Sequence, residues 1–79
     1  MRGDRTMKNI IEEAMAVFMK ELDNILVVRN DAYNKALNAM HRGDVVNYNK
    51  WCEKVKECNA RQIELSNELN KIEAVYAAI

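Results

Sequence analysis

The chain has 79 residues, which leaves room for one domain and little more. Twelve basic residues balance twelve acidic ones, so the overall charge draws the chain strongly neither to nucleic acid nor to an anionic membrane. The composition holds no proline and two glycines, which suits helices and argues against a sheet protein, since sheets need more turn residues.

A first helix is predicted over residues 5–42, with Asp4 or Thr6 as its N-cap. Two apolar stripes follow it at helical spacing. Because two stripes on one helix require two buried contacts, and one partner helix covers only one of them, we expect the second stripe to contact another subunit. The first stripe reads Ile11, Met15, Phe18, Leu22, Ile25, Ala32, Ala36 and Ala39, interrupted by Arg29. The second reads Met19, Leu26, Tyr33 and Met40.

The segment from Val27 to Asp31 leaves two alternatives open for this helix. Two β-branched residues precede an Asn-Asp pair that could end one helix and cap the next. The other alternative is an unbroken helix that runs on to His41. In both cases Gly43 is expected to end the helix, as a glycine just past a helix C-terminus commonly does.

The turn is predicted at residues 42–44, and Asp44 is a good N-cap for a second helix over residues 45–79. Arg-Gly-Asp occurs here and at residues 2–4. Adhesion-receptor recognition is one interpretation of this tripeptide. The interpretation that we prefer is that Gly-Asp precedes a helix in both places.

The second helix carries an apolar seam with alternating steps of three and four residues, which is typical of a helix packed in left-handed coiled-coil geometry. Gln62 is the one clearly polar member, and we interpret it as a residue that sets the register. The seam reads Tyr48, Trp51, Val55, Cys58, Gln62, Leu65, Leu69, Ile72, Tyr76 and Ile79.

The residues beside this seam argue against a parallel homodimer. In such a dimer Lys54 would face Asn59, and Glu68 would face Glu73, so that no pair attracts and the last repels. An antiparallel partner fits better, and the first half of the same chain is the nearest one. We therefore predict an all-α fold, a long antiparallel helical hairpin that forms a single domain over residues 1–79 and assembles with further copies into a helical bundle.

Catalytic and metal-binding chemistry find little support in the residue pattern. His41 is the only histidine, and Cys52 and Cys58 are six residues apart, which is not the spacing of a metal-ligand pair. We expect reduced thiols, no cofactor, no metal and no enzymatic activity. The longest apolar run is too short to span a membrane, and no signal peptide is recognisable, so a cytoplasmic location is expected.

Three kinds of binding residues follow from these patterns. We predict a self-association or partner interface at the second stripe and at the uncharged C-terminal end. Basic residues near the turn are a candidate nucleic-acid contact, and two aromatic residues are candidates for ligand stacking. The predicted interface is Met19, Leu26, Tyr33, Met40, Val75, Tyr76 and Ile79. The basic residues are Lys35, Arg42, Lys50, Lys54 and Lys56, and the aromatic residues are Tyr48 and Trp51.

The function that we expect is that of a small helical interaction protein without enzymatic activity. It would act as an oligomeric adaptor or as an inhibitor that binds another protein, and its small size is compatible with a phage or mobile-element origin. The first alternative is a hairpin dimer that binds nucleic acid through the basic residues near the turn. The second is capture of a small molecule between subunits.

Overall fold

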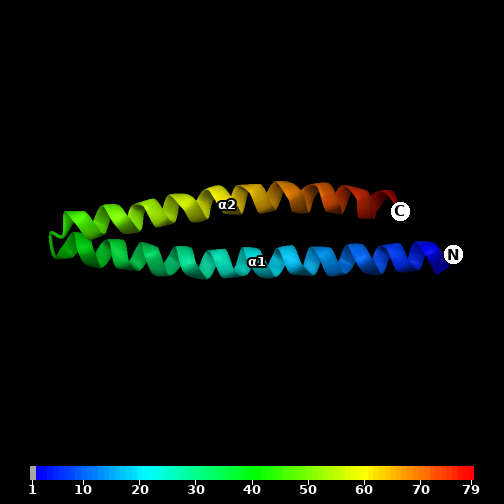
Figure 1. Cartoon of the computed structure of the whole chain (residues 1–79), viewed down its shortest axis with the longest axis horizontal. Helices are drawn as coiled ribbons and strands as arrows, with labels where there is room; N and C mark the ends of the chain where they lie inside the picture. The colour runs from blue at the N-terminus through cyan, green and yellow to red at the C-terminus, as the bar shows by residue number, and fades with distance from the viewer. Residues whose placement is uncertain (1) are drawn as a thin grey trace.

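Two long helices lie side by side and antiparallel in this protein. The computed structural model describes the backbone of residues 2–79 and the side chains of residues 7–79. Within these residues α1 (Arg2–His41) and α2 (Val45–Ala78) pack along their lengths and place both chain termini at the end away from the turn (Figure 1). The predicted all-α helical hairpin is confirmed.

The helix α1 is continuous, so the alternative of a break near residue 30 is wrong. It begins at Arg2, ahead of the predicted start, and the predicted capping side chains of Asp4 and Thr6 lie outside the described ones. Three features hold the Val27–Asp31 region helical. The Asp31 carboxylate pairs with Lys35 one turn later at 3.0 Å, and Ala32 is buried against α2. In addition, the Arg29 side chain donates hydrogen bonds to two side chains of α2.

The turn is built as the sequence predicts. Gly43 has φ +71°, a left-handed conformation that costs glycine little and other residues more. Its N–H donates to the Met40 carbonyl at 3.1 Å, and the Asp44 N–H donates to the Ala39 carbonyl at 2.8 Å, which together form a Schellman motif. The Asp44 side chain then accepts a hydrogen bond from the Asn47 N–H at 3.1 Å and caps α2.

The predicted seam of α2 faces α1. Cys58 and Leu65 are buried, and the rest of the seam is half-buried except at its two ends, where Tyr48 and Ile79 remain partly exposed. Near the turn, the residues of α1 that are buried are all small. These buried small residues are Ala32, Ala36 and Ala39.

One polar layer interrupts the apolar interface between the helices. The Arg29 guanidinium donates to the Gln62 side-chain carbonyl at 2.9 Å and to that of Asn59 at 3.2 Å. Arg29 and Gln62 are the two residues that interrupt the apolar stripe of α1 and the seam of α2. The two polar side chains therefore hydrogen-bond to each other, which fixes the register of α1 relative to α2.

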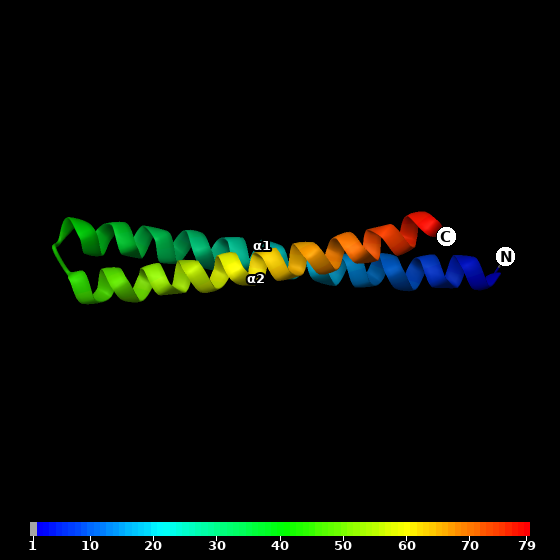
Figure 2. The ribbon, with the colours of Figure 1, turned by 90° about the horizontal axis from the view of Figure 1, so that it is seen from above.

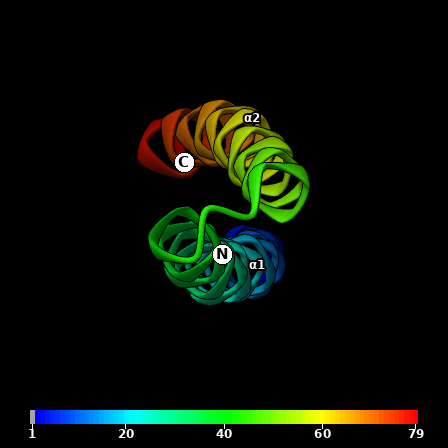
Figure 3. The same cartoon turned by 90° about the vertical axis from the view of Figure 1, so that its left-hand side faces the viewer.

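The hairpin is a narrow rod that buries less of its own surface than a compact protein of the same mass. It measures 63 × 15 × 12 Å, and its helices cross at a shallow angle (Figures 2 and 3). The radius of gyration is 18.0 Å, against about 12 Å for a compact domain of this length. The accessible surface is 6108 Å², whereas a compact protein of this mass exposes roughly 4,900 Å².

Candidate functional site: two unlike faces of the hairpin

The rod has two long faces on which α1 and α2 are exposed side by side. On one face, a hollow of about 280 Å³ lies between Tyr33 and Met40 of α1 and Cys52 of α2. On the other face, a hollow of about 290 Å³ lies between Val28 of α1 and Arg61 of α2. Helical spacing extends each face along the rod, and the two faces differ sharply in charge.

We call the first face the low-charge face. It comprises Asn9, Glu12, Ala16, Met19, Asp23, Leu26, Asn30, Tyr33, Leu37 and Met40 of α1, with Val45, Asn49, Cys52, Lys56, Asn59, Ile63, Ser66, Asn70, Glu73 and Ala77 of α2. Four of these twenty residues carry a formal charge: Glu12, Asp23, Lys56 and Glu73.

We call the opposite face the charged face. It comprises Ile10, Ala14, Val17, Glu21, Asn24, Val28, Asp31, Lys35 and Asn38 of α1 and Arg42 of the turn, with Asn47, Lys50, Lys54, Glu57, Arg61, Glu64, Glu68, Lys71, Val75 and Ala78 of α2. Eleven of these twenty residues are charged. The same rod thus concentrates its charges along one side.

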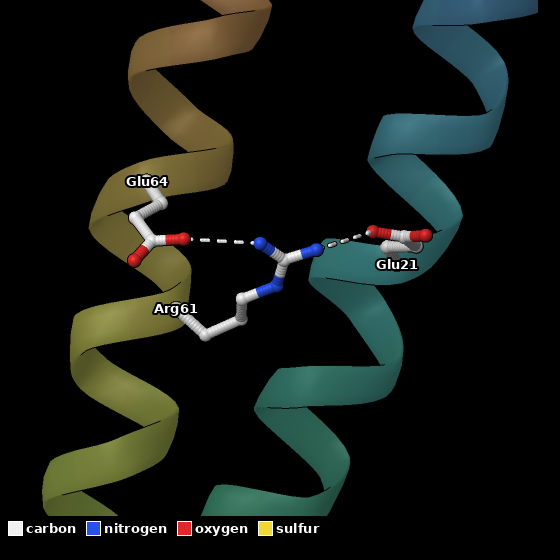
Figure 4. A network of polar contacts seen from close by, with 3 residues as sticks. All are labelled: Glu21, Arg61 and Glu64. Atoms are coloured by element: carbon white, nitrogen blue, oxygen red, sulfur yellow. Dashed lines mark hydrogen bonds and ion pairs between the residues drawn. The ribbon is translucent and has the colours of Figure 1, made fainter.

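The charges on the charged face are largely paired with one another. Arg61 joins the two helices: its Nη2 lies 3.6 Å from the Glu21 carboxylate of α1, and its Nη1 lies 3.0 Å from the Glu64 carboxylate of its own helix (Figure 4). Among the described side chains every other ion pair but one also lies on this face. The exception joins Lys56 to Glu53 at 3.7 Å. The charged face therefore presents polar groups that already have partners.

The low-charge face presents large apolar groups to solvent. Met19 is 57% exposed, Tyr33 56% and Met40 51%, whereas Leu26 is half-buried. On α2, Ile63 is 63% exposed. These apolar side chains recur along one side of α1 with Asp23 and Asn30 between them, whereas the exposed Ile10, Val17 and Val28 of the charged face lie among its charges. Apolar surface gathered on one side of a rod is typical of a surface that binds another macromolecule.

Two tyrosine hydroxyls lie beside this face. The Tyr76 hydroxyl donates to the Glu12 carboxylate at 2.7 Å, and this hydrogen bond raises the pKa of Tyr76. A hydrogen bond with Cys52 raises the pKa of Tyr48. A tyrosine is neutral at about pH 7 even at its ordinary pKa, so both residues add polar surface without charge.

The predicted interface residues do not all lie on one surface. The second stripe, Met19, Leu26, Tyr33 and Met40, runs along the low-charge face. Of the three predicted C-terminal members, Tyr76 is half-buried between the helices, Ile79 lies at the edge of the seam and Val75 lies on the charged face. The C-terminal end thus forms a separate small apolar area at the open end of the rod.

The predicted basic residues gather only in part, and carboxylates lie among them. Lys35 and Lys50 place their Nζ atoms 4.6 and 5.1 Å from the centre of the Trp51 ring. Lys35 also pairs with Asp31, and Lys54 lies 4.0 Å from Glu57. Lys56 lies on the other face, where it pairs with Glu53, and Arg42 is exposed in the turn.

The two aromatic residues predicted to stack on a ligand line different hollows. Trp51 lines a hollow with Lys50 and Lys54 on the side of the charged face. Tyr48 lines the hollow on the low-charge face together with Tyr33 and Met40. A single flat ligand therefore does not meet both rings in one hairpin.

Metal ligands and membrane spans can be assessed for the described residues alone. There, no group of three or more histidine, cysteine, aspartate or glutamate side chains is placed to hold a metal ion. Cys52 and Cys58 are free, and Cys58 is buried. Neither helix, over the part that the structure describes, is long and apolar enough to cross a membrane.

Sequence reasoning missed several residues that the structure brings together. The ion pair of Arg61 with Glu21 joins positions 40 residues apart, and it depends on the antiparallel register rather than on local spacing. Leu37 could have been predicted from the sequence, because it continues the spacing between Tyr33 and Met40 on the same side of α1.

Comparison with known proteins found no matching family model, no matching curated protein and no matching solved structure.

Proposed function

We propose that this chain is a small helical interaction protein that binds a protein partner by packing its low-charge face against helical surface. It would act as an adaptor or as an inhibitor that masks a surface of its partner, without enzymatic activity of its own. The observation that carries the proposal is the row of exposed Met19, Tyr33 and Met40 on the face that holds few charges. Apolar rows of this kind pack into the grooves of a facing helix.

The contrast between the faces supports protein over nucleic acid as the partner. Nucleic-acid contacts draw on lysine and arginine side chains that are free to meet phosphates. Here three of the five candidate basic residues, Lys35, Lys54 and Lys56, each lie within 4.0 Å of a carboxylate of the same chain. An anionic backbone would have to compete with those carboxylates, whereas the apolar row has no competitor within the chain.

Site-specific photocrosslinking tests the proposal even while the partner is unidentified. The photoreactive amino acid p-benzoylphenylalanine replaces Tyr33 on the low-charge face, or Val28 on the charged face as the matched control. Val28 is also exposed and apolar and is on the same helix, at 44% exposure. After irradiation in the cells that express the chain, we expect a protein adduct from position 33 and much less from position 28.

Three outcomes of this experiment would contradict the proposal. They are equal adducts from both positions, adducts with nucleic acid, and no adduct from position 33 at any expression level. The mass of the adduct also identifies the partner class. Twice the chain mass indicates a second copy, and any other mass indicates a different protein.

A further inference from the structure

We infer that the occupant of the low-charge face is a second copy of this chain, seated antiparallel so that α1 packs against α1 and the two turns lie at opposite ends of a four-helix bundle. This inference rests on the proposed function and names the partner for the same face. Three observations support it: the residue pattern of α1, the area that two hairpins can bury against each other, and the small core of the single hairpin.

The low-charge side of α1 is itself a second seam with alternating steps of four and three residues. This spacing, with five of the seven positions apolar or aromatic, is that of a helix that packs against a further helix in coiled-coil geometry. Its first partner, α2, already occupies the other seam of α1. The second seam reads Met19, Asp23, Leu26, Asn30, Tyr33, Leu37 and Met40.

About Asn30 this seam is self-complementary in its apolar residues, except that Asp23 of one copy lies opposite Leu37 of the other. A two-fold axis pairs residue i of one copy with residue j of the other, and j with i. With the axis at Asn30, Met19 lies near Met40 of the second copy and Leu26 lies near Tyr33. The Asn30 side chains then meet each other at the centre, where two amides can both donate and accept hydrogen bonds.

The composition of α2 selects this arrangement over one with both turns at the same end. In the alternative, α1 would face α2 of the second copy, where Leu26 would lie near Asn59 and Ile63 and Met19 near Ser66 and Asn70. Packing α1 on α1 instead places Met19 near Met40 and Leu26 near Tyr33, and its one unfavourable pair is Asp23 with Leu37. The burial of apolar surface therefore favours opposed turns.

The area available is sufficient for a dimer of moderate stability. With the axis at Asn30, the overlap of two hairpins runs from residue 17 to the turn near residue 43, about 40 Å at 1.5 Å per residue. The rod is 15 Å wide. The overlap then covers roughly 600 Å² on each copy and about 1,200 Å² in total, the lower limit of stable interfaces.

The small core of the single hairpin also favours a partner that is always present. Among the side chains that the structure describes, the buried apolar ones are Ala32, Ala36, Ala39, Cys58 and Leu65, of which Leu65 alone is large. Chains of this size that lack disulfides and metals commonly enlarge their core by oligomerisation. A second copy is present wherever the chain is made, which no other partner guarantees.

Distances between spin labels test both the partner and the arrangement. Single cysteines for a nitroxide label replace Glu13 or Asn34, which are exposed and lie on neither face, in a background with Cys52→Ser and Cys58→Ala. Helix geometry puts the two labels of a dimer ~12 Å apart along the bundle axis for Asn34 and ~51 Å apart for Glu13. We therefore expect a distance more than twofold longer for Glu13.

Each other outcome overturns the inference. Similar distances at both positions would mean that the turns lie together, and an absence of dipolar coupling would mean that no second copy binds. Native mass spectrometry of the unsubstituted chain guards against a defect caused by the cysteine replacements. A monomer that still forms a Tyr33 adduct with a different protein would overturn this inference and leave the proposed function standing, whereas a monomer without any adduct would overturn both.

Discussion

At the scale of single residues, the turn is the part of the molecule whose conformation individual side chains specify most fully. Gly43 supplies a left-handed φ, and Asp44 both completes the end of α1 through its N–H and begins α2 through its carboxylate. These roles were predictable from Gly43 and Asp44 because glycine after a helix and aspartate before one each satisfy unpaired backbone groups. Since the Asp44 carboxylate serves as this cap, the Arg-Gly-Asp tripeptide at 42–44 has a structural explanation.

Replacing Gly43 with alanine should destabilise the hairpin by about 1 kcal/mol, because the left-handed conformation is strained for residues with a Cβ. The added methyl group would meet nothing within 4 Å, so steric clash contributes nothing. The measurement is urea unfolding followed by circular dichroism. Arg42→Ala is the neighbouring control and should leave the midpoint nearly unchanged, and an unchanged midpoint for Gly43→Ala would contradict the role of this glycine.

The cap residue Asp44 should make stability depend on pH. Hydrogen bonds from Asn47 hold the pKa of Asp44 below its ordinary value. A carboxyl group with a lowered folded pKa contributes stability that is present above its unfolded pKa, near pH 4, and is lost as the pH falls through the folded pKa. Asparagine caps helices about as well but does not titrate in this range.

Thermal unfolding of the wild type and of Asp44→Asn, compared from about pH 6 down to about pH 2, measures this contribution. We expect the wild type to lose more stability than the variant as the pH falls below about 4. Parallel curves for the two proteins over the whole range would show that the Asp44 carboxylate contributes no pH-dependent stability.

At the scale of the elements, the sequence predicted each helix better than it predicted the relation between the helices. The seam of α2 and the first stripe of α1 follow from spacing alone, because both are periodic and buried. The continuity of α1 through Arg29 could not be decided locally. It depends on Gln62 and Asn59, which reach Arg29 only once the antiparallel register is set. The division into a low-charge and a charged face depends on that register in the same way.

The layer of Arg29 and Gln62 should cost stability while setting register. A leucine at both positions should stabilise the hairpin by about 1 kcal/mol, because it replaces hydrogen-bonded polar groups with apolar contact. Arg29→Leu alone should be destabilising, since Gln62 then lacks its partner. A double-mutant cycle by chemical unfolding measures the coupling, and additive effects of the two replacements would contradict a direct interaction.

At the scale of the whole molecule, the rod leaves more surface exposed than a compact protein of its mass, and its charged residues are unevenly distributed over that surface. The second stripe of α1 was identified in the sequence as apolar surface that α2 cannot cover, and Met19, Tyr33 and Met40 are indeed exposed. What the sequence did not indicate is that most of the ion pairs lie on the opposite side. The two sides are defined by contacts between the helices: the ion pair of Arg61 with Glu21 on the charged face, and the hollow on each face that residues of both helices line.

A charge placed on the low-charge face should weaken association, whereas the same charge on the other face should not. Met19→Glu would bury a carboxylate in the proposed interface, and we expect the dimer dissociation constant to rise by more than about 30-fold, the equivalent of about 2 kcal/mol. Val17→Glu is the matched control, two positions away and 59% exposed on the charged face. Sedimentation equilibrium measures both constants, and equal effects would mean that the low-charge face is not the interface.

A second copy on the low-charge face makes the chain a dimer in solution, so the solution mass of the unmodified chain distinguishes an occupied face from an open one. Light scattering from micromolar to millimolar concentration should give a mass that rises to about 18 kDa, twice the 9.2 kDa of the chain, and stays there. A mass of 9.2 kDa across the whole range would contradict the claim.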